Sequence, residues 1–583
     1  MTPGLPRTIV EALEARAESA PAEPAIWLES LDAPTETITC AGLRDGALGA
    51  ARRLAGSGVG AGDAVVFLLP TGRDLVETFY GALAAGAVAV PLYPPAGARQ
   101  LQASLANVRR VIGLTRPAKL VTLEPLAALL RDQPGIGDAT DVVTAAELGA
   151  AEPAEPERRP RPDDLALVQF SSGSTGVPRG VALTHHNIVF NVRAFQAVVG
   201  MGPPDVAANW LPLYHDMGLI GTLIGTLVIQ IPLALFSPLD FLRSPALWLQ
   251  TMSRYGANMS VAPQFAYNLC VRKVRDEDLD GVDLSHVRLL LNGAEPTDVS
   301  ECRRFEERFA SVGLRRGVVT PCYGLAEHAL AVSMAAPRVE IPVRRVGDVA
   351  AGSTGPPLRG TEIRILDPAP QQDATQQGAR PLVAQQVAWP PVALADETIG
   401  EIALRSESVC AGYVTEGGVE RAVDADGWLR TGDLGFLSGG ELYVVDRLKD
   451  VVIVQGRNLY PHDVEKEVAR VPGVRRGRVA VFGVRSAEHG TEELVVAPEV
   501  VLEEGDDPVR CAAAVRRRVV EGFGVTPHDV VLLPRGRIEL TSSGKLRRHR
   551  IREEYEAGTI GDAIYSLRAS AARQRSALAE VGS

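Results

Sequence analysis

The sequence of 583 residues is 46% hydrophobic and 22% charged, which provides enough apolar material for several domains with substantial buried cores. Its formal net charge of -11 opposes a nucleic acid or an anionic membrane surface as the main partner, because both require a positive field. The six cysteines form no CxxC pair or cysteine–histidine cluster, and residues 1–18 lack signal-peptide features, so we expect a reduced, cytoplasmic setting.

The first part of the chain alternates helix-like segments with short β-rich runs such as AVVFLL and VAVPLYPP. Helix-like patterns lie at residues 11–20, 43–58 and 74–87. Strands separated by helix-length segments predict parallel sheets in a layered α/β architecture. After Gly352 the β segments become shorter, which predicts a small β subdomain. New patterns begin near Arg447, so we expect a large domain at 1–446 and a small α+β domain at 447–583.

Two segments depart from this alternation. Residues 217–236 are apolar over roughly the length of a bilayer span. They contain Gln230 and Pro232 and divide into a helix-like and a strand-like part, so we expect a buried helix and strand and no membrane span. Residues 367–398 are rich in Pro, Gln and Ala without periodicity, which predicts an exposed insertion.

The sharpest local pattern is VQFSSGSTGVPRG at residues 168–180, where an apolar strand runs into a loop of hydroxylated residues and glycines. Glycines let backbone N–H groups approach phosphate oxygens, serine and threonine hydroxyls add donors, and Arg179 adds positive charge. The spacing differs from the Walker pattern GxxxxGK[ST]. The residues therefore predict an anion-binding loop of another type, with a plain flexible turn as the alternative.

Five motifs, in order, resemble those of the adenylate-forming superfamily, which includes acyl-CoA synthetases, luciferases, nonribosomal peptide adenylation domains and fatty acyl-AMP ligases. The pattern at 168–180 resembles the phosphate loop of that superfamily. The others are YGLAE at 323–327, RTGD at 430–433, the hinge motif DRLKD at 446–450 and TSSGK at 541–545. Because the order is kept over nearly the whole chain, the sequence is identified as a member that forms an acyl adenylate from ATP and a carboxylic acid.

The resemblance implies an ATP site, residue by residue. A carboxylate must attack the α-phosphorus of ATP, so cations and hydrogen-bond donors have to converge where two anions meet. Tyr323 and Gly324 are implied at the adenine, and Asp433 is implied to accept both ribose hydroxyls with help from Arg447. Glu327 is implied as the ligand of Mg²⁺, which prefers oxygen ligands. The residues implied to hold the phosphates are Ser171, Ser172, Gly173, Ser174, Thr175 and Gly176.

Further positions complete the implied site. Lys545 would bridge the substrate carboxylate and the α-phosphate, and Lys449 would be the hinge about which a mobile C-terminal domain rotates after adenylate formation. His215 lies in a segment that resembles the mouth of the family's acyl pocket, where a gating role competes with that of an ordinary structural histidine. The loop implied to lie along the adenine face, mainly through its backbone, is Asn292, Gly293, Ala294 and Glu295.

Several segments favour the fatty acyl-AMP ligase branch, among them PLYPP, LPLYHDMGLIG and VVIVQGRNLYPHDVE. The resemblance then implies a fatty acid as substrate and the phosphopantetheine thiol of a holo acyl carrier protein as acceptor. The chain departs from the family pattern in three ways. Arg179 replaces the usual lysine of the phosphate loop, His328 replaces a small residue after Glu327, and the insertion expected after YGLAE is short. Coenzyme A therefore stays open as the acceptor.

Other functions stay open as well. An acyl-CoA synthetase would share the first half-reaction and differ in its acceptor. A catalytically silent acyl-binding relative would usually lack Lys545, Glu327 or Asp433, and all three are present. The last feature is a basic run that is either a contact for an acidic carrier protein or a set of solvated helix faces. It comprises Lys545, Arg547, Arg548 and Arg550, together with Arg516 to Arg518.

Overall fold

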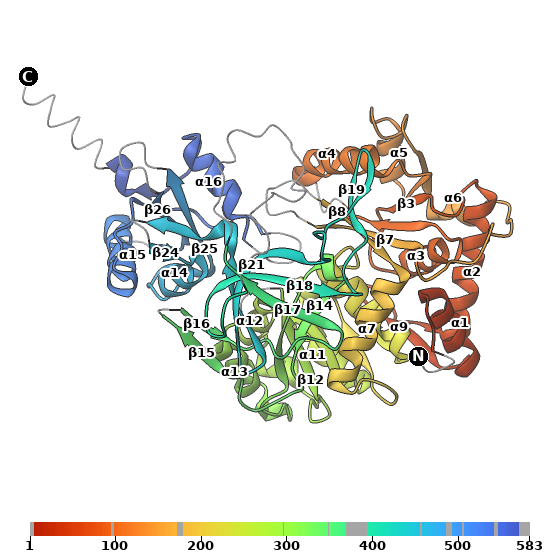
Figure 1. The fold of residues 1–583 in the computed structure, drawn as a ribbon, viewed down its shortest axis with the longest axis horizontal. Helices are drawn as coiled ribbons and strands as arrows, with labels where there is room; N and C mark the ends of the chain where they lie inside the picture. Colours follow the sequence, from red (N-terminus) through yellow and green to blue (C-terminus); the bar gives the residue numbers. More distant parts are fainter. Residues whose placement is uncertain are drawn as a thin grey trace, which may run out of the picture.

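The structure is a computed structural model, and it describes residues 5–94, 98–171, 179–294, 297–347, 349–368, 393–454, 457–485, 492–503, 506–540 and 546–570. Two eight-stranded sheets with helices in layers form the larger part of the molecule, and a smaller unit lies beside them (Figure 1). The layered α/β architecture expected from the sequence is confirmed.

Sheet I carries the phosphate-loop motif. Its strand order is β20 (Gly418–Glu420), β19 (Gly412–Thr415), β8 (Arg179–Thr184), β7 (Leu165–Ser171), β4 (Val88–Pro91), β3 (Ala64–Phe67), β5 (Lys119–Thr122) and β6 (Asp141–Thr144). The strands from β7 to β6 pair in parallel, whereas β8, β19 and β20 add an antiparallel edge. The strands β3 and β4 are apolar runs buried on both faces, as parallel strands covered by helices should be.

Sheet II carries the predicted adenine loop and the YGLAE motif. Its strand order is β14 (Ala331–Met334), β13 (Val319–Gly324), β12 (Leu289–Gly293), β11 (Met259–Pro263), β9 (Ala207–Asn209), β10 (Leu233–Leu235), β1 (Pro24–Leu28) and β2 (Glu36–Thr39). The strands β12 and β13 pair in parallel, with Leu290 opposite Val319. Because parallel strands end at one edge of a sheet, the two motifs meet at the carboxyl edge of sheet II.

Sixteen α-helices lie in the described residues. They are α1 (Ile9–Ser19), α2 (Cys40–Gly56), α3 (Arg73–Ala84), α4 (Ala98–Thr115), α5 (Leu126–Arg131), α6 (Ala145–Gly149), α7 (His185–Val199), α8 (Asp216–Gly218), α9 (Gly225–Ile229), α10 (Pro238–Arg243), α11 (Ala246–Tyr255), α12 (Gln264–Lys273), α13 (Val299–Arg308), α14 (Pro461–Val468), α15 (Pro508–Phe523) and α16 (Arg548–Glu556). One hydrophobic cluster joins α1, α2, α3, α7 and α9 to strands of both large sheets. Separate clusters place α4 and α5 on sheet I and α11 to α13 on sheet II.

The apolar segment 217–236 is part of this core. It forms α8, a π-helix at Leu219–Ile224, α9 and β10, and its apolar side chains are buried. Among the described residues, the structure has no helix whose length and apolar character would let it cross a membrane. The predicted insertion at 367–398 lies largely outside the described residues, which resume at 393.

Smaller sheets follow in the chain. Four strands pair in the order β17 (Thr361–Leu366), β18 (Gly400–Ser406), β21 (Leu429–Ser438) and β22 (Glu441–Arg447), beside the hairpin of β15 (Val343–Val346) and β16 (Val349–Gly352). A 3-10 turn at Leu448–Asp450 then leads into the C-terminal unit, by which we mean the described residues from 451 to 570. That unit contains the hairpin of β23 (Val452–Val454) and β24 (Arg457–Leu459) and the sheet of β25 (Val474–Arg485), β26 (Glu492–Val500), β27 (Asp529–Leu532) and β28 (Tyr565–Ser566). It has hydrophobic clusters of its own.

Candidate active site

Three predicted nucleotide-binding side chains form one cluster between sheet II and the four-stranded sheet. The Tyr323 hydroxyl, near the end of β13, donates a hydrogen bond of 2.6 Å to Asp433 Oδ2. Arg447 Nε lies 3.4 Å from Asp433 Oδ1. Asp433 and Arg447 face each other because the antiparallel register of β21 and β22 pairs them directly. Burial and the Asp433 carboxylate raise the pKa of Tyr323, so its phenol stays protonated as a donor.

The candidate Mg²⁺ ligand lies close to this cluster. Glu327 sits in the 3-10 turn Ala326–His328, and the Tyr413 hydroxyl donates to its Oε1 at 3.1 Å. Burial raises the pKa of Glu327, Asp433 raises it further and Arg447 lowers it, which places all three groups within electrostatic reach of one another. Within the described residues no ion pair forms at Glu327 and no three-residue metal cluster occurs. A single partly buried carboxylate fits Mg²⁺, which keeps waters and shares phosphate oxygens.

The phosphate loop is anchored at both ends by sheet I. Ser171 ends β7 and Arg179 begins β8, and the register pairs them directly, so the intervening loop must turn back at this edge of the sheet. The Arg179 guanidinium lies over the Tyr413 ring, 5.6 Å from its centroid. Tyr413 thereby connects the end of the phosphate loop to Glu327. Sequence reasoning missed Tyr413, and the predicted residues from Ser172 to Gly176 lie outside the described residues.

The adenine loop leaves the carboxyl end of β12. The Asn292 side chain is buried and donates to Gln264 Oε1 at 2.7 Å and to Cys302 Sγ at 3.3 Å, so it points into the core. Ala294 has a φ of 73°, a left-handed conformation that is uncommon outside glycine and turns the chain sharply. These features agree with a loop that offers its backbone to a ligand. Glu295 lies outside the described residues.

His215 lies at a different part of the site, at the start of α8. Its Nδ1 is 2.6 Å from Asp216 Oδ1, and its side chain is 24% exposed. The ring lines a small pocket whose other walls are Trp210, Leu211, Pro212, Met217, Pro263 and Phe265. The walls are apolar apart from His215, but the volume of about 10 Å³ is far too small for an acyl chain. The gating role of His215 stays a prediction.

The second departure from the family motif, His328, has a structural explanation. Its Nδ1 lies 2.8 Å from the Ala331 carbonyl oxygen and 3.2 Å from Asn191 Nδ2, and its Nε2 lies 3.2 Å from Thr361 Oγ1. Burial lowers the pKa of His328 to about 4, so the imidazole is neutral near pH 7. The ring connects α7, β14 and β17, and the extra bulk after Glu327 is accommodated by these contacts.

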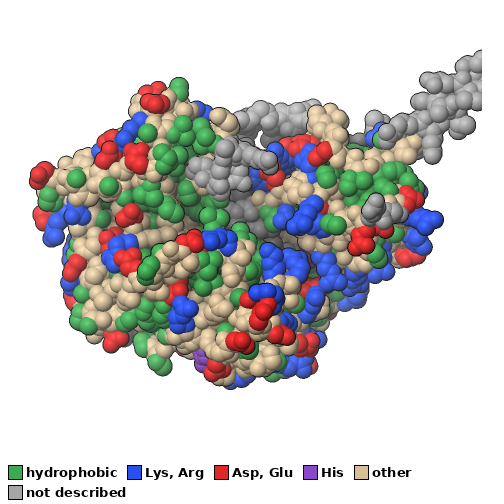
Figure 2. All heavy atoms as spheres, turned by 180° about the vertical axis from the view of Figure 1, so that it is seen from behind, with side chains coloured by type: hydrophobic (Ala, Val, Ile, Leu, Met, Phe, Trp, Pro, Cys, Tyr) green, Lys and Arg blue, Asp and Glu red, His purple; other side chains and the backbone are tan. Residues whose placement is uncertain are grey.

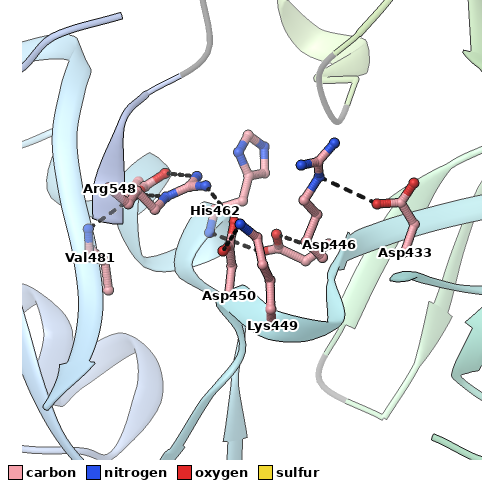
Figure 3. A network of polar contacts seen from close by, with 9 residues as sticks. Asp433, Asp446, Lys449, Asp450, His462, Val481 and Arg548 are labelled. Carbon is pink, nitrogen blue, oxygen red and sulfur yellow. Dashed lines mark hydrogen bonds and ion pairs between the residues drawn. The ribbon is translucent and has the colours of Figure 1, made fainter. Parts of the chain in front are cut away.

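The hinge motif is surrounded by charges (Figure 3). Lys449 Nζ lies 3.8 Å from Asp450 Oδ1, and burial lowers the pKa of Lys449 to about 8 although Asp450 acts in the opposite direction. Arg548, at the start of α16, donates to both oxygens of Glu465 at 2.6 and 2.7 Å and lies 3.3 Å from Asp450 Oδ2. The expectation that Arg548 is a carrier contact or part of a solvated face is wrong, because its side chain is only 21% exposed and points inward. Lys545, three residues earlier, lies outside the described residues.

Comparison with known proteins identifies the family. The sequence profile of the AMP-binding enzymes matches residues 13–414. The long-chain-fatty-acid–AMP ligase FadD26 of Mycobacterium marinum is 34% identical, covering 94% of this chain and 97% of the relative. FadD23 of Mycobacterium tuberculosis, with the same enzyme name, is 34% identical over 84% and 85%, respectively. The 4-hydroxyphenylalkanoate adenylyltransferase of Mycobacterium tuberculosis is 32% identical over 85% and 82%.

Solved structures agree with these relatives. A chain from a study of fatty acyl-adenylate ligases from E. coli and L. pneumophila superposes with a TM-score of 0.84 at 30% identity, covering 94% of this chain and 98% of that one. A fatty acyl-adenylate ligase from L. pneumophila in complex with acyl adenylate and pyrophosphate gives a TM-score of 0.67 at 27% identity, covering 96% and 98%. The profile match, the relatives and the superpositions together show that the chain belongs to the AMP-binding enzyme family, in its fatty acyl-AMP ligase branch.

Proposed function

We propose that the protein uses ATP and Mg²⁺ to convert a fatty or related carboxylic acid into an acyl adenylate with release of pyrophosphate. It then transfers the acyl group to the phosphopantetheine thiol of a holo acyl carrier protein. The observation that carries the proposal is the convergence of Tyr323, Asp433 and Arg447 with Glu327 beside the anchored phosphate loop. This arrangement brings a ribose acceptor, a cation and a metal ligand to one place.

Each group in the cluster has a role in the proposed adenylation. Asp433 would accept the ribose hydroxyls while Arg447 holds its carboxylate in place, and the Tyr323 ring would lie against adenine. Arg179 and Lys545 would offset the charge that develops as the substrate carboxylate attacks the α-phosphorus. Glu327 would hold Mg²⁺, which supplies further positive charge at the phosphates.

The acyl substrate would enter beside His215. The residues that line the small pocket next to it are mostly apolar and would have to move apart to admit a hydrocarbon or aryl chain. The relatives include enzymes named for long-chain fatty acids and one named for 4-hydroxyphenylalkanoates, so both acid classes belong in a substrate panel.

The second half-reaction requires a change of domain arrangement. We propose that the chain divides into domains at 1–446 and 447–583 and that the second rotates about Lys449 to admit the acceptor thiol. Figure 2 shows Lys and Arg side chains gathered on the C-terminal unit and near its junction with the larger part, a charge that suits an acidic carrier protein. All six cysteines are unpaired, which fits a reduced cytoplasmic setting.

Acid-dependent ATP–pyrophosphate exchange tests the first half-reaction. We expect exchange with a defined class among fatty, hydroxy and aryl acids, a requirement for Mg²⁺, and loss of exchange in Lys545→Ala. Arg550→Ala is the matched control, because it also removes one cation of the same basic run but is 47% exposed and pairs with Glu539. Folded wild-type protein that supports no exchange with any acid would contradict the proposal.

A competition between acceptors tests the second half-reaction. The acyl-adenylate-forming enzyme is incubated with holo carrier protein, apo carrier protein or coenzyme A, and the acylated products are measured by mass spectrometry. Acylation of the holo carrier alone supports the carrier-protein assignment. Formation of acyl-CoA at a comparable rate would instead identify an acyl-CoA synthetase.

A further inference from the structure

A short, partly exposed ion pair joins the C-terminal unit to the larger part of the molecule. Lys466 Nζ, on α14, lies 2.7 Å from Asp298 Oδ2 at the N-terminus of α13. The Asp298 side chain is only 17% exposed, whereas that of Lys466 is 41% exposed. We call this contact the α13–α14 ion pair.

The two carboxylate oxygens of Asp298 have separate tasks. Oδ1 caps α13, because it accepts from the Ser300 backbone N–H at 2.9 Å and from the Ser300 hydroxyl at 2.6 Å. Oδ2 faces Lys466. Burial alone would raise the pKa of Asp298, but the hydrogen bonds from Lys466 and Ser300 lower it below its ordinary value, so the carboxylate is charged near neutral pH.

The ion pair connects two segments that belong to the nucleotide site. On the large side, Asp298 is the N-cap of α13 and lies four residues after Ala294, in the segment between β12 and α13 that contains the predicted adenine loop. On the C-terminal side, Glu465 is the neighbour of Lys466 on α14 and binds Arg548 through both carboxylate oxygens. Arg548 follows the predicted catalytic lysine by three residues. Two side-chain contacts, Asp298 with Lys466 and Glu465 with Arg548, therefore lie between the segment after β12 and the start of α16.

Neighbouring contacts favour the same arrangement of the two parts. Tyr460, directly before α14, packs against the apolar cluster of Val349, Ala351, Phe436 and Tyr443 in the larger part. Arg476 on β25 lies 4.0 Å from Glu301 on α13, but its side chain is 62% exposed. The apolar contact of Tyr460 holds the two parts together but is not directional. Of the two charged contacts, the α13–α14 ion pair is the shorter and the less exposed, so it defines how α14 lies against α13.

We propose that Lys466 and Asp298 are positioning residues for adenylation, and that their ion pair holds the C-terminal unit in the arrangement that serves adenylation and breaks when the C-terminal domain rotates. The proposal rests on the proposed function, because it assigns the observed arrangement to the first half-reaction. A pair that must break in each cycle should be strong enough to bias the arrangement but not to lock it, as expected for a partly exposed ion pair.

A mutant cycle of neutral variants tests the coupling. Asp298→Asn keeps a capping acceptor for α13, and Lys466→Gln keeps the length of the side chain. We expect each variant to lower kcat for acid-dependent pyrophosphate exchange about fivefold, the upper end for one partly exposed pair. The double variant should be no worse than either single one. Arg510→Gln, 91% exposed on α15, is the matched control and should leave exchange unchanged.

The rate of the second half-reaction distinguishes a positioning role in adenylation from a general loss of folding or activity. Isolated acyl adenylate is given to the same variants together with the acceptor thiol, and acyl transfer is measured. We expect transfer at the wild-type rate or faster, because the rotated arrangement does not contain the pair. Equal losses in exchange and transfer, additive losses in the double variant, or no loss in exchange would overturn the proposal.

A chemical cross-link tests the contact between Lys466 and Asp298 independently of enzyme activity. A carbodiimide joins an ammonium and a carboxylate in direct contact, so it should link Lys466 to Asp298 in the wild-type protein, with the product identified by peptide mass spectrometry. Lys466→Gln provides the blank. If the cross-link forms in protein that supports no exchange, the contact exists and the proposed function is wrong. If the cross-link does not form in active, folded protein, the α13–α14 ion pair is wrong.

Discussion

Replacing Arg548 by methionine should destabilise the C-terminal unit more than any other single loss of a charge in its basic run. Arg548 Nε and Nη2 donate to the two oxygens of Glu465, and Nη1 approaches Asp450 (Figure 3). Glu465 is 8% exposed, and its only other hydrogen bond among the described residues comes from the Val481 backbone N–H. Methionine fills much of the same volume but leaves this carboxylate without a cation.

The expected loss of stability follows from the Glu465 carboxylate that the substitution leaves unpaired. Removing one partner of a buried ion pair costs about 3 to 5 kcal/mol, because the remaining charge is desolvated and unpaired. The Arg548 side chain is 21% exposed and Asp450 is 22% exposed, so water can reach part of the cluster. We therefore expect the variant to lose about 3 kcal/mol of local stability, the lower end of that range.

The expected loss depends on pH in a defined direction. Burial already raises the pKa of Glu465 against the opposing effect of Arg548, so removing the arginine should raise it further. A folded-state pKa above the unfolded value gives stability that is present at low pH and is lost as pH rises through the folded pKa. The deficit of Arg548→Met relative to wild type should therefore shrink on acidification from pH 8 to pH 5, by up to about 1.4 kcal/mol per pH unit.

The assay must report on the C-terminal unit itself. All five tryptophans precede Arg447, so intrinsic fluorescence follows the larger part of the molecule. Hydrogen exchange of α14 and β25, followed by mass spectrometry across pH, measures the local opening free energy directly. The double variant Arg548→Met with Glu465→Gln should recover much of the loss, and Arg550→Met should show little. A deficit that is the same at pH 5 and pH 8 would refute the reasoning.

Three further results are expected. Asp433→Asn should raise the KM for ATP about tenfold in pyrophosphate exchange, because Arg447 loses its anionic partner; an unchanged KM would argue against a ribose contact. Tyr413→Phe should raise the Mg²⁺ concentration for half-maximal exchange a few-fold, because Glu327 loses the hydroxyl that orients it; the same Mg²⁺ dependence as wild type would separate Tyr413 from the metal. Tyr460→Ala should cost about 2 kcal/mol of packing and speed hydrogen exchange in the β15–β16 hairpin; unaltered exchange there would contradict the interdomain contact.

The sequence was most informative where its motifs resemble those of the family. That resemblance implied one nucleotide site for Tyr323, Asp433 and Arg447, and the structure brings Tyr323, near the end of β13, together with the pair on β21 and β22. The architecture could be predicted because the strands are apolar runs separated by helix-length segments. These are local signals that a single sequence contains.

Contacts between distant segments could not be predicted in this way. Tyr413 reaches Glu327 from a strand 86 residues later, and nothing in the run AGYVT distinguishes a metal-site neighbour from an ordinary edge tyrosine. Arg548 was misjudged for the same reason. A basic run predicts a solvated helix face when no acidic partner is close in the sequence. The partner of Arg548 is Glu465, which lies on another helix. Pairing across elements depends on tertiary distances, to which a single sequence gives no access.

The proposed hinge at Lys449 divides the charged contacts around it into two groups. Glu465 and Asp450 follow Lys449 in the chain, so their contacts with Arg548 can travel with the C-terminal unit when it rotates. Asp446 precedes Lys449 and accepts from the His462 backbone N–H at 3.3 Å, so the proposed rotation would break this contact together with the α13–α14 ion pair. The proposed rotation would keep the contacts of Arg548 with Glu465 and Asp450. It would separate Arg548 from the buried Asp446 carboxylate, whose pKa burial raises and Arg548 lowers. Keeping the pair of Arg548 with Glu465 favours a rotation that recurs in each cycle, because breaking this buried ion pair each time would cost several kcal/mol.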